Sequence, residues 1–149
     1  MLSNKGKYGL KAMVDLAGAP PDRPVLVSDI AERNDIPKKF LDAILGELRN
    51  AGLVRSRKGP GGGYALARPP EEIRIGHIIR VLDGPLAPIG CASRTAYQPC
   101  EDCADIQHCA VRLLMLQVRD AISSVLDQRT LAEMRAMSAA ERRSFLYQI

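Results

Sequence analysis

The residues of this chain best suited to chemistry are its four cysteines, which all lie in one window of the 149-residue sequence. They are Cys91, Cys100, Cys103 and Cys109, spaced C-x8-C-x2-C-x5-C. Cysteines that only filled a hydrophobic core would be scattered along the chain. Thiolates are soft ligands, so four of them in one loop suit zinc or an iron–sulfur cluster of the 2Fe-2S or 4Fe-4S type. We therefore predict a metal or cluster site held by these side chains.

Two other interpretations of the cysteines stay open. A thiol–disulfide redox switch needs exposed cysteines with low pKa values, and the acidic neighbours Glu101, Asp102 and Asp105 oppose it by raising thiol pKa values. Four inert cysteines are the other alternative, which the clustering disfavours. His108 directly precedes Cys109 and is a reserve ligand, although a histidine in such a place is more often a surface or helix-cap residue.

A second motif lies upstream, where a basic, glycine-rich turn joins two short apolar segments in RSRKGPGGGYAL. Residues 53–57 and 63–67 are predicted to pair as strands, with the glycines at the hairpin tip. Arg57 and Lys58 would then reach the minor groove of DNA, where narrow A·T tracts attract cations. Gly59 and the glycines at 61–63 would let the backbone approach phosphates without a Cβ clash. A nucleotide-binding P-loop needs a different order of elements.

Three helices are predicted before this hairpin, over residues 5–18, 26–34 and 37–50. Pro37 suits the first turn of the third helix, and Gly52 suits the position just after its end. Three helices followed by a hairpin make a winged helix-turn-helix. The predicted fold class is therefore mainly α with a small β-hairpin wing, plus a long dimerisation helix described below.

The third helix is predicted to lie in the major groove, because an α-helix fits there and the base edges can be distinguished. Its first lysines would neutralise phosphates, and an aspartate would accept a hydrogen bond from a cytosine amino group. The residues expected to face DNA are Lys38, Lys39, Phe40, Asp42 and Ala43. The apolar face expected to pack inward is Phe40, Leu41, Ile44, Leu45 and Leu48.

Two further helical patterns cover about 75–83 and 106–127. The longer helix would be roughly 30 Å long, which exceeds what a small protein needs for its own core. A dimerisation helix is therefore predicted, with packing inside one chain as the alternative. Its apolar stripe consists of Val111, Leu114, Met115, Val118, Ile122 and Val125. Two short closing helices are predicted over 130–134 and 138–149.

Three regions follow from these patterns: a DNA-binding winged helix-turn-helix over 1–84, a cysteine-rich sensor loop over 85–108, and the dimerisation helix with C-terminal helices over 109–149.

The charge of the chain is unevenly distributed. Residues 1–68 hold 12 Lys/Arg and 7 Asp/Glu, a net charge of +5, and residues 69–149 hold 9 Lys/Arg and 10 Asp/Glu, a net charge of −1. Together they give the net charge of +4. The basic half coincides with the predicted DNA-binding region.

Composition excludes several classes of protein. With 46% hydrophobic residues the chain is not disordered, and the lack of a long apolar run or a signal-peptide segment predicts a cytoplasmic protein with no membrane contact. No GxSxG or HExxH motif occurs, which argues against an enzyme. A small four-cysteine electron-transfer protein is the rival from another class. An electron-transfer function does not explain the basic hairpin. Salt-dependent DNA binding would distinguish a transcription regulator from an electron-transfer protein.

Three segments carry a wider resemblance: KGKYGLKAMVDLA, SDIAERNDIPKKFLDAILGELRNAGLVRSRKGPGGGYALA and IRIGHIIRVLDGPLAPI. They resemble the IscR/NsrR/CymR family of bacterial transcription regulators over nearly the whole chain. The resemblance implies a homodimer whose long helix crosses to the partner subunit. It also implies binding to palindromic, double-stranded promoter DNA, usually as a repressor.

The iron–sulfur branch of that family has three loop cysteines, and the resemblance assigns them to Cys91, Cys103 and Cys109, with Cys100 as an extra thiol. It implies a cluster that senses iron, oxygen, nitric oxide or redox state and modulates operator binding. Either all four cysteines bind, or three bind with another group such as His108. We favour four thiolates, because they complete a tetrahedral set.

Two positions depart from the family's cluster-binding pattern. Where relatives supply a histidine or an aspartate as a further ligand, this chain has Arg112 and Lys7, which cannot bind iron. The CymR branch lacks the cluster cysteines and regulates sulfur metabolism with a cysteine-synthase partner. The DGPLAPI and FLYQI segments resemble that branch, so a protein partner of cysteine metabolism is a further expectation.

Overall fold

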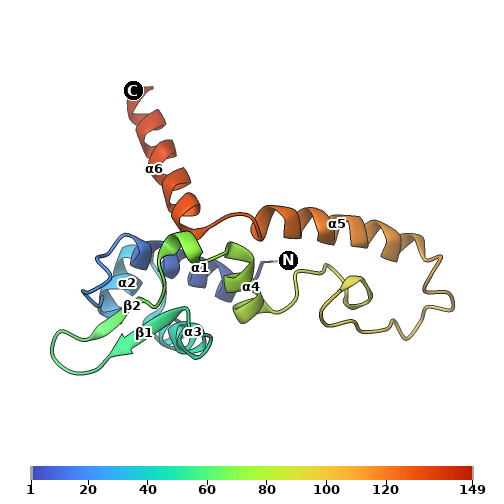
Figure 1. The fold of residues 1–149 in the computed structure, drawn as a ribbon, viewed down its shortest axis with the longest axis horizontal. Helices are drawn as coiled ribbons and strands as arrows, with labels where there is room; N and C mark the ends of the chain where they lie inside the picture. Colours follow the sequence, from blue (N-terminus) through green and yellow to red (C-terminus); the bar gives the residue numbers. More distant parts are fainter. Residues whose placement is uncertain (1, 149) are drawn as a thin grey trace.

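The computed structural model describes residues 2–148 as a mainly helical chain with one small hairpin (Figure 1), which confirms the predicted fold class. Its helices are α1 (Asn4–Ala17), α2 (Val27–Asn34), α3 (Lys38–Asn50), α4 (Ile75–Asp83), α5 (Ala110–Leu126) and α6 (Leu131–Tyr147). The hairpin pairs β1 (Val54–Arg57) with β2 (Gly63–Leu66), and single 3-10 turns lie at η1 (Pro70–Glu72) and η2 (Gly90–Ala92). Within residues 2–148, no helix combines the length and the apolar character that crossing a membrane requires.

The hydrophobic core lies between α1, α2, α3 and α4. The buried side chains of α3 recur at helical spacing and form one stripe; they are Leu41, Ile44, Leu45 and Leu48. They share one core with Met13 of α1, Ile30 of α2 and Ile78 of α4, all of which are fully buried. Burial of this stripe leaves the opposite side of α3 free to face a ligand.

The prediction that Phe40 packs inward is wrong, because its side chain is 64% exposed. Phe40 lies about 100° around the helix from Leu41 and so falls at the border of the buried stripe. Its position in the first turn of α3 leaves the ring in solvent beside Lys39. The other role predicted for Phe40, on the DNA-facing side, stays a prediction.

Truncation of Leu45 tests the importance of this core. Leu45 is fully buried, and Leu45→Ala removes apolar contacts and leaves a cavity, so we expect the free energy of unfolding to fall by about 3 kcal/mol. Urea denaturation followed by circular dichroism measures the change. Leu26→Ala is the matched control, since Leu26 is 52% exposed; an equal loss in both variants would contradict the assignment of Leu45 to the core.

An isolated β-bridge attaches β2 of the wing to the segment that precedes α2. Val25 and Tyr64 exchange backbone hydrogen bonds of 2.8 and 2.9 Å. Gly63 has φ 141°, and a Cβ at this position would lie 2.2 Å from the Val25 carbonyl oxygen. Only glycine therefore allows β2 to approach the segment before α2 this closely.

The C-terminal helices depart from the prediction in two respects. α5 begins at Ala110, later than the predicted residue 106, because turns occupy the preceding residues and Cys109 is its N-cap. Its 17 residues correspond to about 25 Å. The prediction of two closing helices is wrong: α6 is continuous, since a capping box of Thr130 and Glu133 starts it and neither Gly nor Pro interrupts it. Its first residue, Leu131, is buried in the same core as α3.

Candidate functional site

The predicted DNA-facing residues of α3 gather on its solvent side. Lys38, Lys39, Asp42 and Ala43 are exposed, as is Phe40. Lys38 Nζ lies 3.1 Å from Asp42 Oδ2, an ion pair one helical turn apart in which both side chains stay about half exposed. Asp42 is thus paired with Lys38 of the same helix, and the Lys38 ammonium keeps further donors free for a phosphate.

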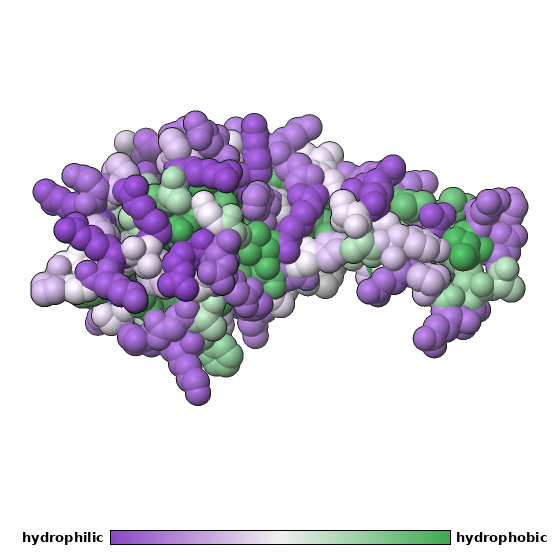
Figure 2. All heavy atoms as spheres, turned by 60° about the horizontal axis from the view of Figure 1, so that its bottom comes forward, coloured by the Kyte–Doolittle hydropathy of each residue, from purple (hydrophilic) through white to green (hydrophobic). Residues whose placement is uncertain are grey.

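The hairpin of β1 and β2 starts next to α3 and extends away from it to its tip (Figure 1). Arg57, Lys58 and Gly59 are exposed, and neither of the two cations has an ion-pair partner among residues 2–148. Gly59 and Gly61 have positive φ values of 88° and 72°, which the tight tip requires. Figure 2 brings this side forward and shows hydrophilic side chains over most of the winged-helix body.

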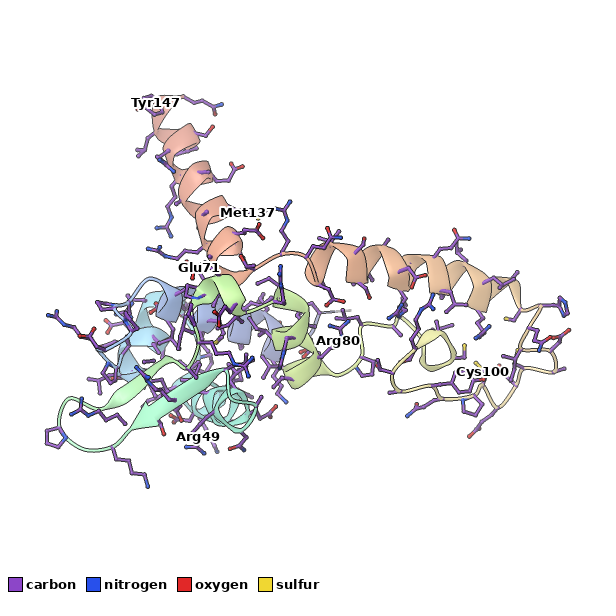
Figure 3. The ribbon with its side chains drawn as sticks, in the orientation of Figure 1. Arg49, Glu71, Arg80, Cys100, Met137 and Tyr147 are labelled. Atoms are coloured by element: carbon purple, nitrogen blue, oxygen red, sulfur yellow. The ribbon has the colours of Figure 1, made fainter. Side chains whose placement is uncertain are left out.

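Arg49 is a cation that the predicted set of DNA contacts omits. It lies in the last turn of α3 and is exposed, and Figure 3 shows it on the side of α3 that faces away from the core. The helical period of the sequence could have identified this residue. Arg49 follows Lys38 by eleven residues and Asp42 by seven, which places all three side chains on one stripe of α3.

The cysteine loop leaves the body after α4 and returns at the start of α5 (Figure 1). Cys91 is buried, Cys103 and Cys109 are half-buried, Cys100 is exposed, and all four are free thiols. They lie in two pairs of neighbours, Cys91 with Cys100 and Cys103 with Cys109. Among residues 2–148, no three side chains of His, Cys, Asp or Glu are grouped so that they could hold a metal ion. The predicted four-thiol ligand set therefore stays a prediction.

The pKa values of the thiols differ with their surroundings. The hydrogen bond with Cys91 raises the pKa of Cys100. Desolvation, and then the hydrogen bond with Cys109, raises the pKa of Cys103. The backbone N–H of Arg112 lowers the pKa of Cys109, as expected for an N-cap thiol at the positive end of α5. Cys109 therefore forms a thiolate more readily than Cys103 does.

By donor chemistry alone, the thiols of the loop suit a soft metal or cluster better than the nearby nitrogen groups do. The Nδ1 atom of His108 lies 2.8 Å from Asp105 Oδ2, and the ring is 81% exposed; this hydrogen bond lowers the pKa of Asp105. Arg112 donates from Nε to the Cys91 carbonyl oxygen at 3.0 Å. Arg112 thereby ties η2 to α5, while His108 is occupied by its own loop.

α5 carries an apolar stripe, yet none of its residues is buried. The predicted interface residues are exposed (Val111, Leu114, Val125) or half-buried (Met115, Val118, Ile122). On α5 and α6, the exposed large apolar residues that the prediction omitted are Leu113, Met137, Phe145, Leu146 and Tyr147. Packing inside one chain therefore does not account for this surface.

Comparisons with known proteins agree with these features. Residues 2–136 match the Rrf2 family, described as an iron-dependent transcriptional regulator. A relative from Rhodobacter capsulatus, described as an rrf2-like HTH-type transcriptional regulator, is 42% identical over 139 residues, which are 91% of this chain and 93% of the relative. The HTH-type transcriptional regulator IscR of Aliivibrio salmonicida is 36% identical over 133 residues, which are 89% of this chain and 76% of the relative.

A solved structure supports the same relationship. CymR, the global cysteine regulator of Bacillus subtilis, matches with a TM-score of 0.75 and 37% identity, over 92% of this chain and 97% of that one. The relatives carry the names of transcriptional regulators. The prediction of a DNA-binding regulator rather than an enzyme is thereby confirmed.

Proposed function

Since this chain belongs to the Rrf2 family of transcriptional regulators, we propose that it is a homodimeric repressor whose operator binding is modulated by an iron–sulfur cluster on its cysteine loop. The observation that carries DNA binding is the division of α3, which buries Leu41, Ile44, Leu45 and Leu48 and exposes Lys38, Lys39 and Arg49 beside the wing. A palindromic operator requires two such helices, related by a twofold axis and about one DNA turn apart, ~34 Å.

The homodimer is supported by the uncovered stripe of α5. A helix of 17 residues with no buried side chain gains little from the hydrophobic effect in one chain. A second copy of α5 would cover Leu114, Val118 and Ile122. The same protein would act in the cytoplasm, where a bacterial promoter is found.

The cofactor proposal rests on the four free thiols. Cys91, Cys100, Cys103 and Cys109 would hold the cluster, and when bound it would supply sensitivity to iron, oxygen, nitric oxide or redox state. Arg112 would keep the Cys91 backbone against α5, and Cys109 would present its thiolate at the start of α5. The loop is thus attached to the helix that joins the two subunits. Structural zinc on the same thiols is the alternative occupant.

A thiol redox switch is a second candidate, favoured by the pairing of the thiols. Cys103 and Cys109 are neighbours, as are Cys91 and Cys100. Oxidation of one pair by a peroxide would break its O–O bond and form one S–S bond. The peroxide would accept the two protons and two electrons and leave as two waters, or as one alcohol and one water. A protein partner of cysteine metabolism is part of the proposal for either switch.

Removing single lysines tests the DNA-binding proposal. Lys38→Ala, Lys39→Ala and Lys58→Ala should each weaken binding roughly three- to tenfold, and each should reduce the slope of log affinity against log salt by about 1 for every phosphate that is no longer neutralised. Fluorescence anisotropy measures this on a palindromic duplex selected by the protein from a random-sequence library.

Lys11→Ala is the matched control for these three variants. Its ammonium donates to the Asn34 carbonyl oxygen at 2.7 Å, at the end of α2, so its replacement should leave the salt slope unchanged. Unchanged affinity and slope in all three test variants would contradict the proposed DNA-binding face.

A further inference from the structure

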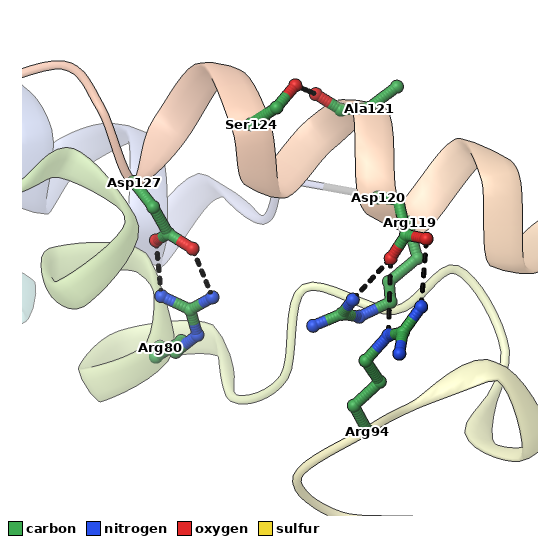
Figure 4. A network of polar contacts seen from close by, with 7 residues as sticks. All are labelled: Arg80, Arg94, Arg119, Asp120, Ala121, Ser124 and Asp127. Atoms are coloured by element: carbon green, nitrogen blue, oxygen red, sulfur yellow. Dashed lines mark hydrogen bonds and ion pairs between the residues drawn. The ribbon is translucent and has the colours of Figure 1, made fainter.

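An ion pair between Arg80 and Asp127, here called the joint, connects α5 to α4. The Arg80 guanidinium forms a two-point ion pair with Asp127, with Nη1–Oδ1 and Nη2–Oδ2 distances of 2.6 and 2.9 Å (Figure 4). Asp127 caps the C-terminus of α5, and Arg80 lies in the last turn of α4. Such bidentate arginine–carboxylate pairs fix the relative orientation of the two groups as well as their distance.

Backbone contacts hold the turn between α5 and α6 against the same segment. Ile75 N–H donates to the Arg129 carbonyl oxygen at 3.0 Å, and Leu131 N–H donates to the Ile73 carbonyl oxygen at 2.8 Å. Ile73, Ile75 and Leu131 all belong to the winged-helix core. The end of α5 is therefore fixed to the DNA-binding body.

Gly76 makes room for this ion pair. A Cβ at residue 76 would lie 2.0 Å from Asp127 Oδ1 and 3.0 Å from Arg80 Nη1. Gly76 is the second residue of α4, and glycine has a poor helix propensity, so helix propensity does not explain its place there. The space that it leaves is occupied by the Asp127 carboxylate.

Further along α5, the cysteine loop is tied to the same helix. Arg94, three residues after Cys91, bonds Asp120 through Nη2 at 2.9 Å, and Arg119 also bonds Asp120 (Figure 4). Arg112 holds the Cys91 carbonyl oxygen. The loop, α5 and the winged-helix body are thereby linked by consecutive polar contacts.

We propose that Arg80 and Asp127 are positioning residues for operator recognition, because their ion pair fixes the angle between α5 and the winged-helix body. This inference rests on the proposed homodimer and its DNA binding. A rotation of about 10° at one end of a helix of about 25 Å moves the other end by about 4 Å, and one base-pair step is about 3.4 Å. A small change at the joint would therefore alter the half-site spacing that the dimer fits.

Operator spacing separates this role from a purely structural one. The two side chains are 33% and 42% exposed, so the pair contributes little to stability. We would measure affinity for duplexes that carry the selected half-sites with the spacer shortened or lengthened by single base pairs. The wild-type protein should discriminate against a one-base-pair change by at least about tenfold.

Two different variants should reduce this discrimination to about threefold or less. Asp127→Asn keeps the shape of the side chain and removes its charge, whereas Gly76→Ala displaces the carboxylate sterically. Both should leave the thermal midpoint nearly unchanged. Glu71→Gln is the matched control, since Glu71 is exposed and has no ion-pair partner in the described part of the chain.

Wild-type spacing preference in both variants would overturn the positioning role while leaving the proposed function intact. If the wild-type protein bound no duplex, or sedimented as a monomer, the proposed function would fail and this inference with it. Relaxed spacing in Glu71→Gln as well would also overturn it, because the effect would then not be specific to the joint.

Discussion

Alanine at Cys91 or at Cys109 is expected to abolish the metal content of the protein. In the proposed ligand set, Cys91 is the buried thiol of the four and Cys109 is the N-cap of α5, so both lie on defined secondary structure. Loss of either thiolate leaves an incomplete ligand set, and a cluster bound by too few thiolates is lost. The measurement is iron, sulfide and zinc content after purification without oxygen, together with the visible absorption spectrum.

His108→Ala is the control for the cysteine variants. The ring is bonded to Asp105 and mostly exposed, so this variant should keep its full metal content if four thiolates form the site. Full metal content in Cys91→Ala or Cys109→Ala would contradict the ligand assignment. Wild-type protein with zinc but neither iron nor sulfide would replace the cluster with structural zinc, and protein without metal would favour the thiol switch.

The sequence predicts the winged helix-turn-helix well because its signals are local. Pro37 precedes α3, Gly52 follows it, and the Leu41–Leu48 stripe repeats with helical period. The wing is also predicted from local sequence, because a glycine run between two short apolar segments is typical of a β-hairpin. Predictions of this kind depend on contacts within a few residues, which the chain encodes directly.

Other features depend on partners that are distant in the sequence. Phe40 is apolar, yet its place at the edge of the stripe leaves it in solvent. The pairing of Cys91 with Cys100 depends on how the loop folds back, which spacing does not determine. Arg80 and Asp127 are 47 residues apart, so no periodic pattern indicates that they meet. The position of Arg49, by contrast, follows from helical spacing alone.

Replacing Val118 with aspartate is expected to dissociate the dimer. Val118 lies in the middle of the α5 stripe and is half-buried in the single chain. In a twofold-symmetric interface, each copy would bring an unpaired carboxylate into an apolar contact, and burial of such a charge is costly. Sedimentation equilibrium should show a monomer where the wild-type protein is a dimer.

Dissociation of the Val118→Asp variant should also weaken operator binding by at least about 100-fold, since each half-site must then bind alone. Gln117→Asp is the matched control, because it places the same charge next to Val118 on an exposed position of α5. It should remain dimeric and bind DNA normally. A Val118→Asp protein that stayed dimeric would contradict the α5 interface, whereas a monomer with unchanged operator affinity would show that the two half-sites are not bound jointly. Only the combined loss of dimer and of affinity agrees with α5 as the element that joins two DNA-binding units.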